Sequence, residues 1–413
     1  MRSRIFFQWQ RICLVLVLIC FCCQTSRAQL DPEKRRLLQF GYNQPLEGRG
    51  PIAGYAFFYL NEPNFGRTNL ILRVVLAPVY LDSELGIRQA LGPNTDVGMG
   101  VSGGGFADSY SEVRKGNLLQ EESFTGHGVE VNASVYHRFN PEALIPLTGI
   151  FRLGLRQSYY MRDNRTASTF VLPEDQKTGF VRAGLRWGGK EPLILPELAM
   201  ELSAWYEGQF RSSPGLYGYA RDRELNEDSH LFWARALFAY TLPESRHNFS
   251  VSITSGASLN ADRLSAYRLG GVLPMGAEFP LNLPGYYFQE LTAKRYLLMD
   301  GQYTLPLDTA KCWFITGFAG TGLVDYLPGL EQPGHWHSGA GGGITYESPK
   351  RSWMVILGYG YGFDAIRGDE RGAQSVGLFC QFDLEAFYGH PTGADQPRLN
   401  PTRFRGFDWL LGR

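Results

Sequence analysis

Residues 126–161 read GHGVEVNASVYHRFNPEALIPLTGIFRLGLRQSYYM, and their pattern decides the fold class. In the first half, polar residues such as Glu130 and Ser134 alternate with valine and alanine. In the second half, Arg152 and Arg156 alternate with phenylalanine and leucine. Successive side chains of a β-strand point to opposite faces, so this pattern predicts two long strands with one apolar and one polar face.

The same alternation recurs along most of the chain. Many of the segments are far longer than the five or six residues of an ordinary soluble strand, and they exceed the roughly 9–11 residues that cross a bilayer at a tilt. They predict an all-β protein, a transmembrane antiparallel β-barrel of about 14–16 strands over residues 51–387. The segments are 51–62, 67–81, 95–112, 126–139, 149–161, 179–189, 197–210, 230–242, 247–259, 293–307, 311–324, 338–348, 352–363 and 374–387.

The composition favours a membrane barrel over a soluble protein. The chain has 49 glycines and 14% aromatic residues, and no apolar run of helix-spanning length follows residue 28. Membrane barrels combine aromatic girdles with a weak hydropathy signal in each strand. A soluble protein would need a separate explanation for each of these features.

The N-terminus predicts export to the bacterial outer membrane. Arg2, Arg4 and Arg11 precede an uncharged apolar run at 12–23, and a small-x-small site ends at Ala28. This is the layout of a secretory signal peptide over residues 1–28. Its removal takes four of the 40 basic residues and no acidic residue, which leaves a net charge of −4.

The segments that flank the expected barrel are short. We expect a periplasmic N-terminal segment at 29–50, with no further domain before the barrel, and a C-terminal tail at 388–413. The tail could enter the lumen, cover the periplasmic mouth or add a strand. Its apolar residues are Phe404, Phe407, Trp409, Leu410 and Leu411.

A segment near the C-terminus resembles the BamA/TamA family of bacterial surface antigen barrels. A strand ends at Gly270-Gly271, a loop with the tip Leu-Pro-Gly-Tyr follows at 283–286, and the next strand ends in Tyr-x-x-Pro-Leu at 303–307. The resemblance covers about residues 230–387. It implies a loop at 260–292 that folds into the lumen as a plug or gate. The residues it points to are Arg268, Gly270, Gly271, Gly285, Tyr286, Tyr287, Phe318 and Gly322.

The resemblance also implies a function, which is assembly or translocation of unfolded outer-membrane or secreted proteins. Two departures weaken it. The family arginine at the loop tip is Pro284 here, and the aspartate that receives it is Gly320. Both partners are missing together, so we expect no electrostatic latch on the loop. The periplasmic receptor domains of the family have no counterpart in the sequence.

Charged residues on the polar faces of neighbouring strands predict a cluster in the lumen. Residues two apart on one face lie within reach of the adjacent strand. They either form an ion-pair network that braces the lumen or give a passive porin an arginine stripe that prefers anions. This porin is the alternative function. The cluster comprises Glu130, Arg152, Arg156, Arg182, Arg186, Glu201 and Glu207.

No motif predicts an enzyme. No glycine-rich loop is followed by Gly-Lys-Ser/Thr, so no phosphate-binding loop is expected. His335 and His337 could form a metal pair, but the absence of a cysteine or carboxylate in a ligand pattern favours a surface or girdle role. Cys312 and Cys380, the two cysteines outside the signal peptide, predict no disulfide framework. We expect no catalytic residue, cofactor, metal or nucleic acid, and outer-membrane lipid as a partner.

Overall fold

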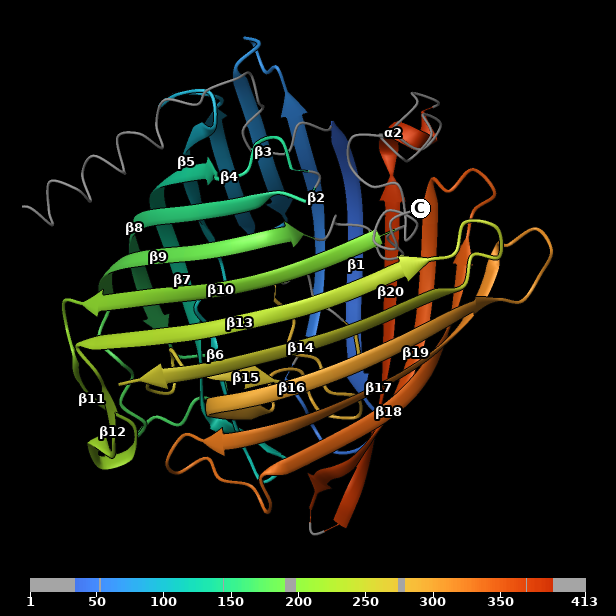
Figure 1. Cartoon of the computed structure of the whole chain (residues 1–413). Coiled ribbons are helices and arrows are strands. Elements are labelled where there is room, and N and C mark those ends of the chain that lie inside the picture. Colours follow the sequence, from blue (N-terminus) through green and yellow to red (C-terminus); the bar gives the residue numbers. More distant parts are fainter. Residues whose placement is uncertain are drawn as a thin grey trace, which may run out of the picture.

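The computed structural model describes residues 34–51, 53–143, 145–189, 198–273, 279–368 and 370–388. Sixteen antiparallel strands close into one barrel (Figure 1), which confirms the predicted fold class. In order around the barrel they are β1 (Arg35–Pro45), β2 (Ala53–Pro63), β3 (Leu70–Ala77), β4 (Tyr80–Ile87), β5 (Thr95–Gly104), β7 (Asn117–Arg138), β8 (Leu147–Met161), β9 (Gln176–Gly189), β10 (Leu198–Arg211), β13 (Asp228–Thr241), β14 (Asn248–Leu259), β16 (Leu291–Pro306), β17 (Trp313–Tyr326), β18 (Trp336–Glu347), β19 (Trp353–Arg367) and β20 (Glu370–Asp383).

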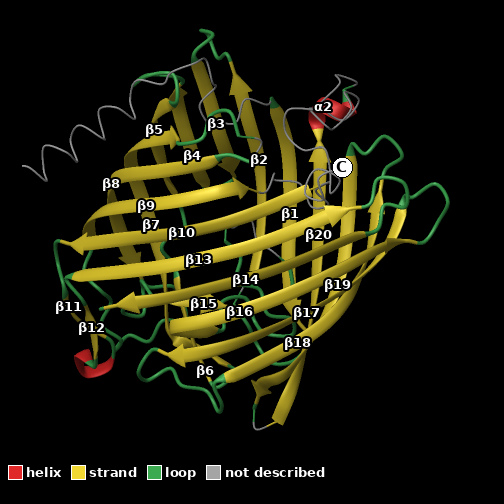
Figure 2. Ribbon diagram, viewed as in Figure 1, coloured by secondary structure: helices red, strands yellow, loops and turns green. Residues whose placement is uncertain are grey.

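The remaining elements are short (Figure 2). They are β6 (Tyr110–Arg114), β11 (Gly215–Tyr217), η1 (Tyr219–Arg221), β12 (Arg223–Leu225), β15 (Tyr267–Leu269) and α2 (Leu384–Phe387). No helix in the described ranges is long and apolar enough to cross a membrane. The predicted signal peptide lies outside the described residues, as does the predicted tail beyond Tyr388.

The two ends of the barrel differ. The start of β1 and the end of β20 share one end, which we call the terminus end, and short turns join the strands there. The opposite end, called the loop end, carries the longest connections. These are 105–116, 162–175, 212–227, 260–290 and 327–335.

The barrel begins earlier than predicted. Residues 35–45, expected in a periplasmic segment, form β1, which pairs with β2 and also with β20. The β1–β20 ladder of nine residue pairs, from Leu37↔Asp383 to Pro45↔Ser375, closes the barrel. The pattern was weak because Leu37 and Leu38 are adjacent, so one leucine faces the lumen and the alternation is blurred.

One segment that was predicted as a single strand forms two strands in the structure. The segment 67–81 divides at the turn around Pro78 into β3 and β4, which pair from Ala77↔Tyr80 to Leu70↔Ile87. The two-residue turn preserves the alternation across it, so the hairpin resembled one strand and β4 was not recognised. Proline has no N–H to donate, which suits the turn and not the interior of a ladder.

The alternation separates the inside of the barrel from the outside as predicted. On β8, Leu153 and Leu155 are exposed on the outer wall, whereas Arg152 and Arg156 point inwards to carboxylates of other strands. An apolar outer wall on strands of this length fits the hydrocarbon core of a bilayer. Near the terminus end, a chain of ring contacts crosses five neighbouring strands through Trp313, Tyr346, Trp353, Phe382 and Phe40. Aromatic rings of this kind mark the membrane–water interface.

This assignment makes Leu153→Arg a test of the membrane wall. Leu153 lies halfway along β8, and an arginine at the bilayer midplane of a barrel costs about 2–4 kcal/mol. Met161→Arg, at the loop end of the same strand, should cost about 0–1 kcal/mol. Denaturant unfolding of both variants in lipid vesicles measures the difference. Equal costs would contradict the placement of the wall.

Candidate functional site: the inward loop and the lumen

The loop between β15 and β16 leaves the wall and enters the lumen. Gly270 and Gly271 begin the departure with φ values of 136° and 103°, a region that favours glycine. The two arms of the loop then pair, because the Gly270 amide donates to the Leu281 carbonyl at 2.8 Å and Leu283 donates to Gly271 at 3.0 Å. Behind them, Tyr286 and Tyr287 are each 1% exposed. These parts of the loop therefore lie inside the barrel.

The tip of the loop lies directly on the backbone of β18 and β19. A Cβ on Gly285, which has a φ of 84°, would lie 1.8 Å from the Gly362 amide nitrogen. A Cβ on Gly339 would lie 2.3 Å from the Pro284 carbonyl oxygen. Glycines in these strands thus provide the space in which the tip docks.

Gly285→Ala should therefore undock the tip. The added methyl group meets backbone rather than a flexible side chain, and the residue would keep a left-handed conformation. We expect faster proteolysis at the loop in the folded barrel than in the native chain. Gly215→Ala, at a loop-end glycine with open space around it, is the matched control. A native cleavage pattern for Gly285→Ala would contradict the close approach.

The loop has an electrostatic latch, contrary to expectation, made by residues other than the family pair. Glu290 is fully buried, and its two carboxylate oxygens each lie 2.9 Å from a guanidinium nitrogen of Arg367 on β19. The same guanidinium stacks 3.6 Å from the ring centroid of Tyr287 and donates to the Gly285 carbonyl at 3.2 Å. Glu290 also accepts the Tyr287 amide at 2.7 Å. Two-point pairing plus ring stacking suits arginine specifically.

The loop also binds both strands of the closing seam. On β1, the side-chain amide of Asn43 exchanges two hydrogen bonds of 3.2 Å with the backbone of Leu273. On β20, the Ser375 hydroxyl accepts the Gly285 amide at 3.2 Å. The docked loop thus braces β1 against β20 from inside the barrel.

Tyr286 reveals a role for a histidine that we expected at the surface. His337 is fully buried at the start of β18, and its Nδ1 lies 2.9 Å from the Tyr286 hydroxyl. Tyr326 binds its Nε2. The surface interpretation was wrong because the histidine lies on the inner face, where it receives the loop. Within the described ranges, no cluster of three histidine, cysteine or acidic residues could hold a metal.

The other residues implied by the resemblance lie at different heights along the barrel. Phe318 packs against the apolar cluster of Val272 and Leu273. Gly322 lies beside Leu298 on the neighbouring strand. Arg268 takes no part in the latch, because it stacks 4.3 Å from the ring centroid of Tyr110 at the loop end.

The predicted charge cluster forms on the inner wall of β7–β10, and each of its arginines has an acidic partner. The closest contacts are Arg156–Glu130 at 2.7 Å, Arg182–Glu207 at 2.5 Å, Arg152–Glu84 at 3.7 Å and Arg186–Glu201 at 3.8 Å. Glu84 and Arg235, which we did not predict, complete the network, and Arg235 lies 2.7 Å from Glu201. These contacts form a network of ion pairs along the inner wall.

The inward loop reaches this charged wall as well. Phe279 lies with its ring centroid 4.4 Å from the guanidinium of Arg235 and 5.8 Å from that of Arg186. Its ring also makes T-shaped contacts with Trp205 and Trp233, which stack on each other. One part of the loop therefore touches β18–β20 and another touches β9–β13, so the loop crosses the lumen.

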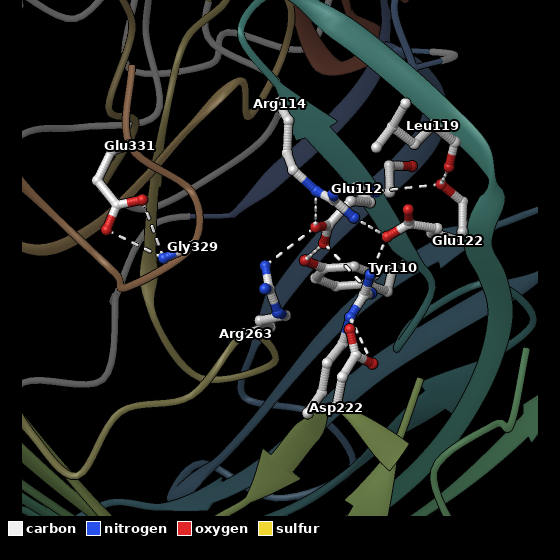
Figure 3. Close-up of polar contacts among 12 residues, drawn as sticks. Tyr110, Glu112, Arg114, Leu119, Glu122, Asp222, Arg263, Gly329 and Glu331 are labelled. Atoms are coloured by element: carbon white, nitrogen blue, oxygen red, sulfur yellow. Dashed lines mark hydrogen bonds and ion pairs between the residues drawn. The ribbon is translucent and has the colours of Figure 1, made fainter. Parts of the chain in front are cut away.

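A second group of ion pairs lies among the connections at the loop end (Figure 3). Glu112 of β6 is fully buried and lies 2.8 Å from Arg114 and 3.0 Å from Arg263. Glu122 of β7 pairs with Arg114 and with Arg223 of β12. These ion pairs join three of the long connections, those at 105–116, 212–227 and 260–290. These ion pairs could not be predicted from the sequence, because their partners come from segments far apart in the chain.

Comparison with solved structures finds barrels with a similar fold. CdiB from Acinetobacter baumannii aligns with 86% of this chain and 61% of its own, with a TM-score of 0.55 and 12% identity. BamA from Haemophilus ducreyi lacking POTRA domains 1–3 aligns with 83% and 70%, with a TM-score of 0.52 and 11% identity. CdiB from Escherichia coli aligns with 87% and 67%, with a TM-score of 0.50 and 12% identity. The fold is that of the CdiB and BamA barrels.

The likeness is one of fold. At identities of 11–12% it does not extend to activity, and the chain spans 61% of the length of the first CdiB. No family model and no curated protein matches the sequence. The CdiB and BamA fold agrees with the resemblance found at 230–387, although it does not distinguish a BamA/TamA-type barrel from a CdiB-type barrel.

Proposed function

We propose that this chain is a bacterial outer-membrane barrel that assembles or translocates polypeptides, with the inward loop as its gate. The observation that carries the proposal is the inward loop, whose described parts at 270–273 and 279–290 contact opposite sides of the lumen and are latched to the wall by Arg367 and Glu290. A barrel built for passive diffusion needs an open lumen. Here the lumen holds a loop with two anchoring regions, and the arginines that could attract anions already face carboxylates.

The bracing of the seam supports the same proposal. Because Asn43 and Ser375 bind the loop from the two strands that close the barrel, loop release and seam stability are coupled. A barrel that passes a polypeptide must either clear its lumen or open its wall between two strands. Both changes would begin at the same contacts.

Single-channel conductance of the purified chain in a planar bilayer tests the proposal. We expect small or absent conductance in the native chain and a large increase after deletion of 272–290, since the deletion removes the plug. A purified barrel in vesicles should also speed the insertion of a small urea-unfolded outer-membrane barrel protein. Failure to affect either conductance or insertion would refute the gate.

The same conductance recording distinguishes the gated barrel from the alternative function, a passive porin that prefers anions. That alternative requires a large, steady conductance in the native chain, with an ion preference that reverses when Arg152, Arg156, Arg182 and Arg186 become glutamate. Because these arginines pair with acids, we instead expect the reversed variant to fold poorly.

A further inference from the structure

Two tryptophans on the inner wall form a platform for aromatic rings. Trp205 of β10 and Trp233 of β13 are paired across one ladder, and their rings stack with centroids 6.0 Å apart and planes 7° apart. A Cβ on Gly184 of β9 would lie 2.2 Å from the Trp205 indole, so this glycine leaves the space in which the ring lies. Guanidinium groups lie beside both rings, that of Arg186 at 5.0 Å from Trp205 and that of Arg182 at 5.8 Å from Trp233.

A residue of the inward loop occupies this platform. Phe279 makes T-shaped contacts with Trp205 at 5.6 Å and with Trp233 at 6.0 Å between ring centroids. Its ring also receives the guanidinium of Arg235 at 4.4 Å and that of Arg186 at 5.8 Å. We call Trp205, Trp233, Arg186 and Arg235 the indole pocket. Edge-to-face and cation–π contacts are open to any aromatic ring, so the pocket recognises a class of side chain and not Phe279 alone.

Phe279 fills the indole pocket without satisfying its hydrogen-bond donors. The indole Nε1 atoms of Trp205 and Trp233 are both buried, and neither has an acceptor among the described residues. A phenyl ring carries no oxygen that could accept these N–H groups. Because a buried donor without a partner costs free energy, a ligand that combines an aromatic ring with a carbonyl or hydroxyl oxygen suits the pocket better than Phe279 does.

We propose that the indole pocket binds aromatic side chains of a polypeptide in the lumen, and that Phe279 occupies it as a substitute while the inward loop is docked. Every aromatic residue of a polypeptide brings a ring with a backbone carbonyl beside it, which is the chemistry that the pocket lacks in Phe279. The inference rests on the proposed function, since a polypeptide has to enter the lumen. A residue that displaces Phe279 removes one anchor of the loop and leaves the latch of Arg367 with Glu290 as the other.

Ligand titration of the full chain tests the indole pocket without any transport. The Phe279→Ala variant vacates the pocket, and saturation-transfer NMR measures its binding of N-acetyltyrosinamide and of N-acetylleucinamide. We expect the tyrosine amide to bind at least about tenfold more tightly, because leucine lacks the ring–ring and cation–π contacts. Trp233→Leu in the same background should abolish this preference. Equal affinity for the two amides would overturn the proposal, and this comparison uses one folded protein, so it stays decisive if the Trp233→Leu variant does not fold.

Competition between the amides and a polypeptide links the indole pocket to transport. In vesicles that contain the Phe279→Ala chain, saturating N-acetyltyrosinamide should slow the insertion of a urea-unfolded outer-membrane barrel protein, whereas N-acetylleucinamide should not. Accelerated insertion that the tyrosine amide leaves unchanged would show that client residues do not use the pocket. If the native chain does not speed insertion at all, the proposed function fails, and a tyrosine preference in the titration would still identify the pocket as a site for aromatic ligands.

Discussion

Replacing Glu290 with glutamine is expected to release the inward loop and turn a silent barrel into a conducting one. Glu290 is fully buried and holds Arg367 through two contacts of 2.9 Å. Removal of one partner from a buried pair leaves the other charge uncompensated, at a cost of about 3–5 kcal/mol. That cost shifts the ratio of docked to released loop by more than about a hundredfold. Single-channel recording should show the change as a large rise in the open fraction.

An exposed ion pair gives the matched control for this prediction. Asp325→Asn removes the partner of Arg295, where the closest contact is 3.8 Å and the two side chains are 55% and 63% exposed. Exposed pairs of this kind contribute about 0–1 kcal/mol. We therefore expect the channel of the Asp325→Asn variant to stay closed in single-channel recording. If Glu290→Gln stays closed as well, the pair with Arg367 does not hold the loop.

Replacing Glu201 with glutamine should cause a large loss of stability. Glu201 is 1% exposed and lies 2.7 Å from Arg235 and 3.8 Å from Arg186. Without its charge, two arginines remain on a wall that also carries Phe279. We expect a loss of about 3–5 kcal/mol in the free energy of unfolding. Guanidinium unfolding in vesicles measures it.

Glu62→Gln makes the same chemical change at the rim of the barrel. Glu62 pairs with Lys34 and Arg36, both of which are 43% exposed, so water can solvate the charges that remain. The expected cost is about 0–1 kcal/mol. A similar cost at both positions would show that the lumen is as well hydrated as the rim, and the bracing network would then not exist.

The barrel wall could be predicted from the sequence because it depends on local alternation. Leu153 faces lipid and Arg152 faces the lumen as a direct consequence of their positions along one strand. The prediction failed where alternation was ambiguous, as at Leu37–Leu38 in β1, and where a turn preserved it, as at Pro78. The inward loop was found from its resemblance to a family and not from periodicity.

The contacts that define the candidate site were decided only by the tertiary structure. Glu290 and Arg367 are 77 residues apart, and neither lies at a position where the family latch is found. Glu84 and Arg152 meet across three strand ladders, and His337 becomes a receptor for Tyr286 only because the loop folds inwards. Alternation determines which face a side chain takes, since that follows from backbone geometry alone. Which partner a side chain contacts depends on barrel closure and strand register, because these bring residues that are far apart in the sequence to the same height along the barrel axis. A local sequence pattern carries no information about such long-range contacts.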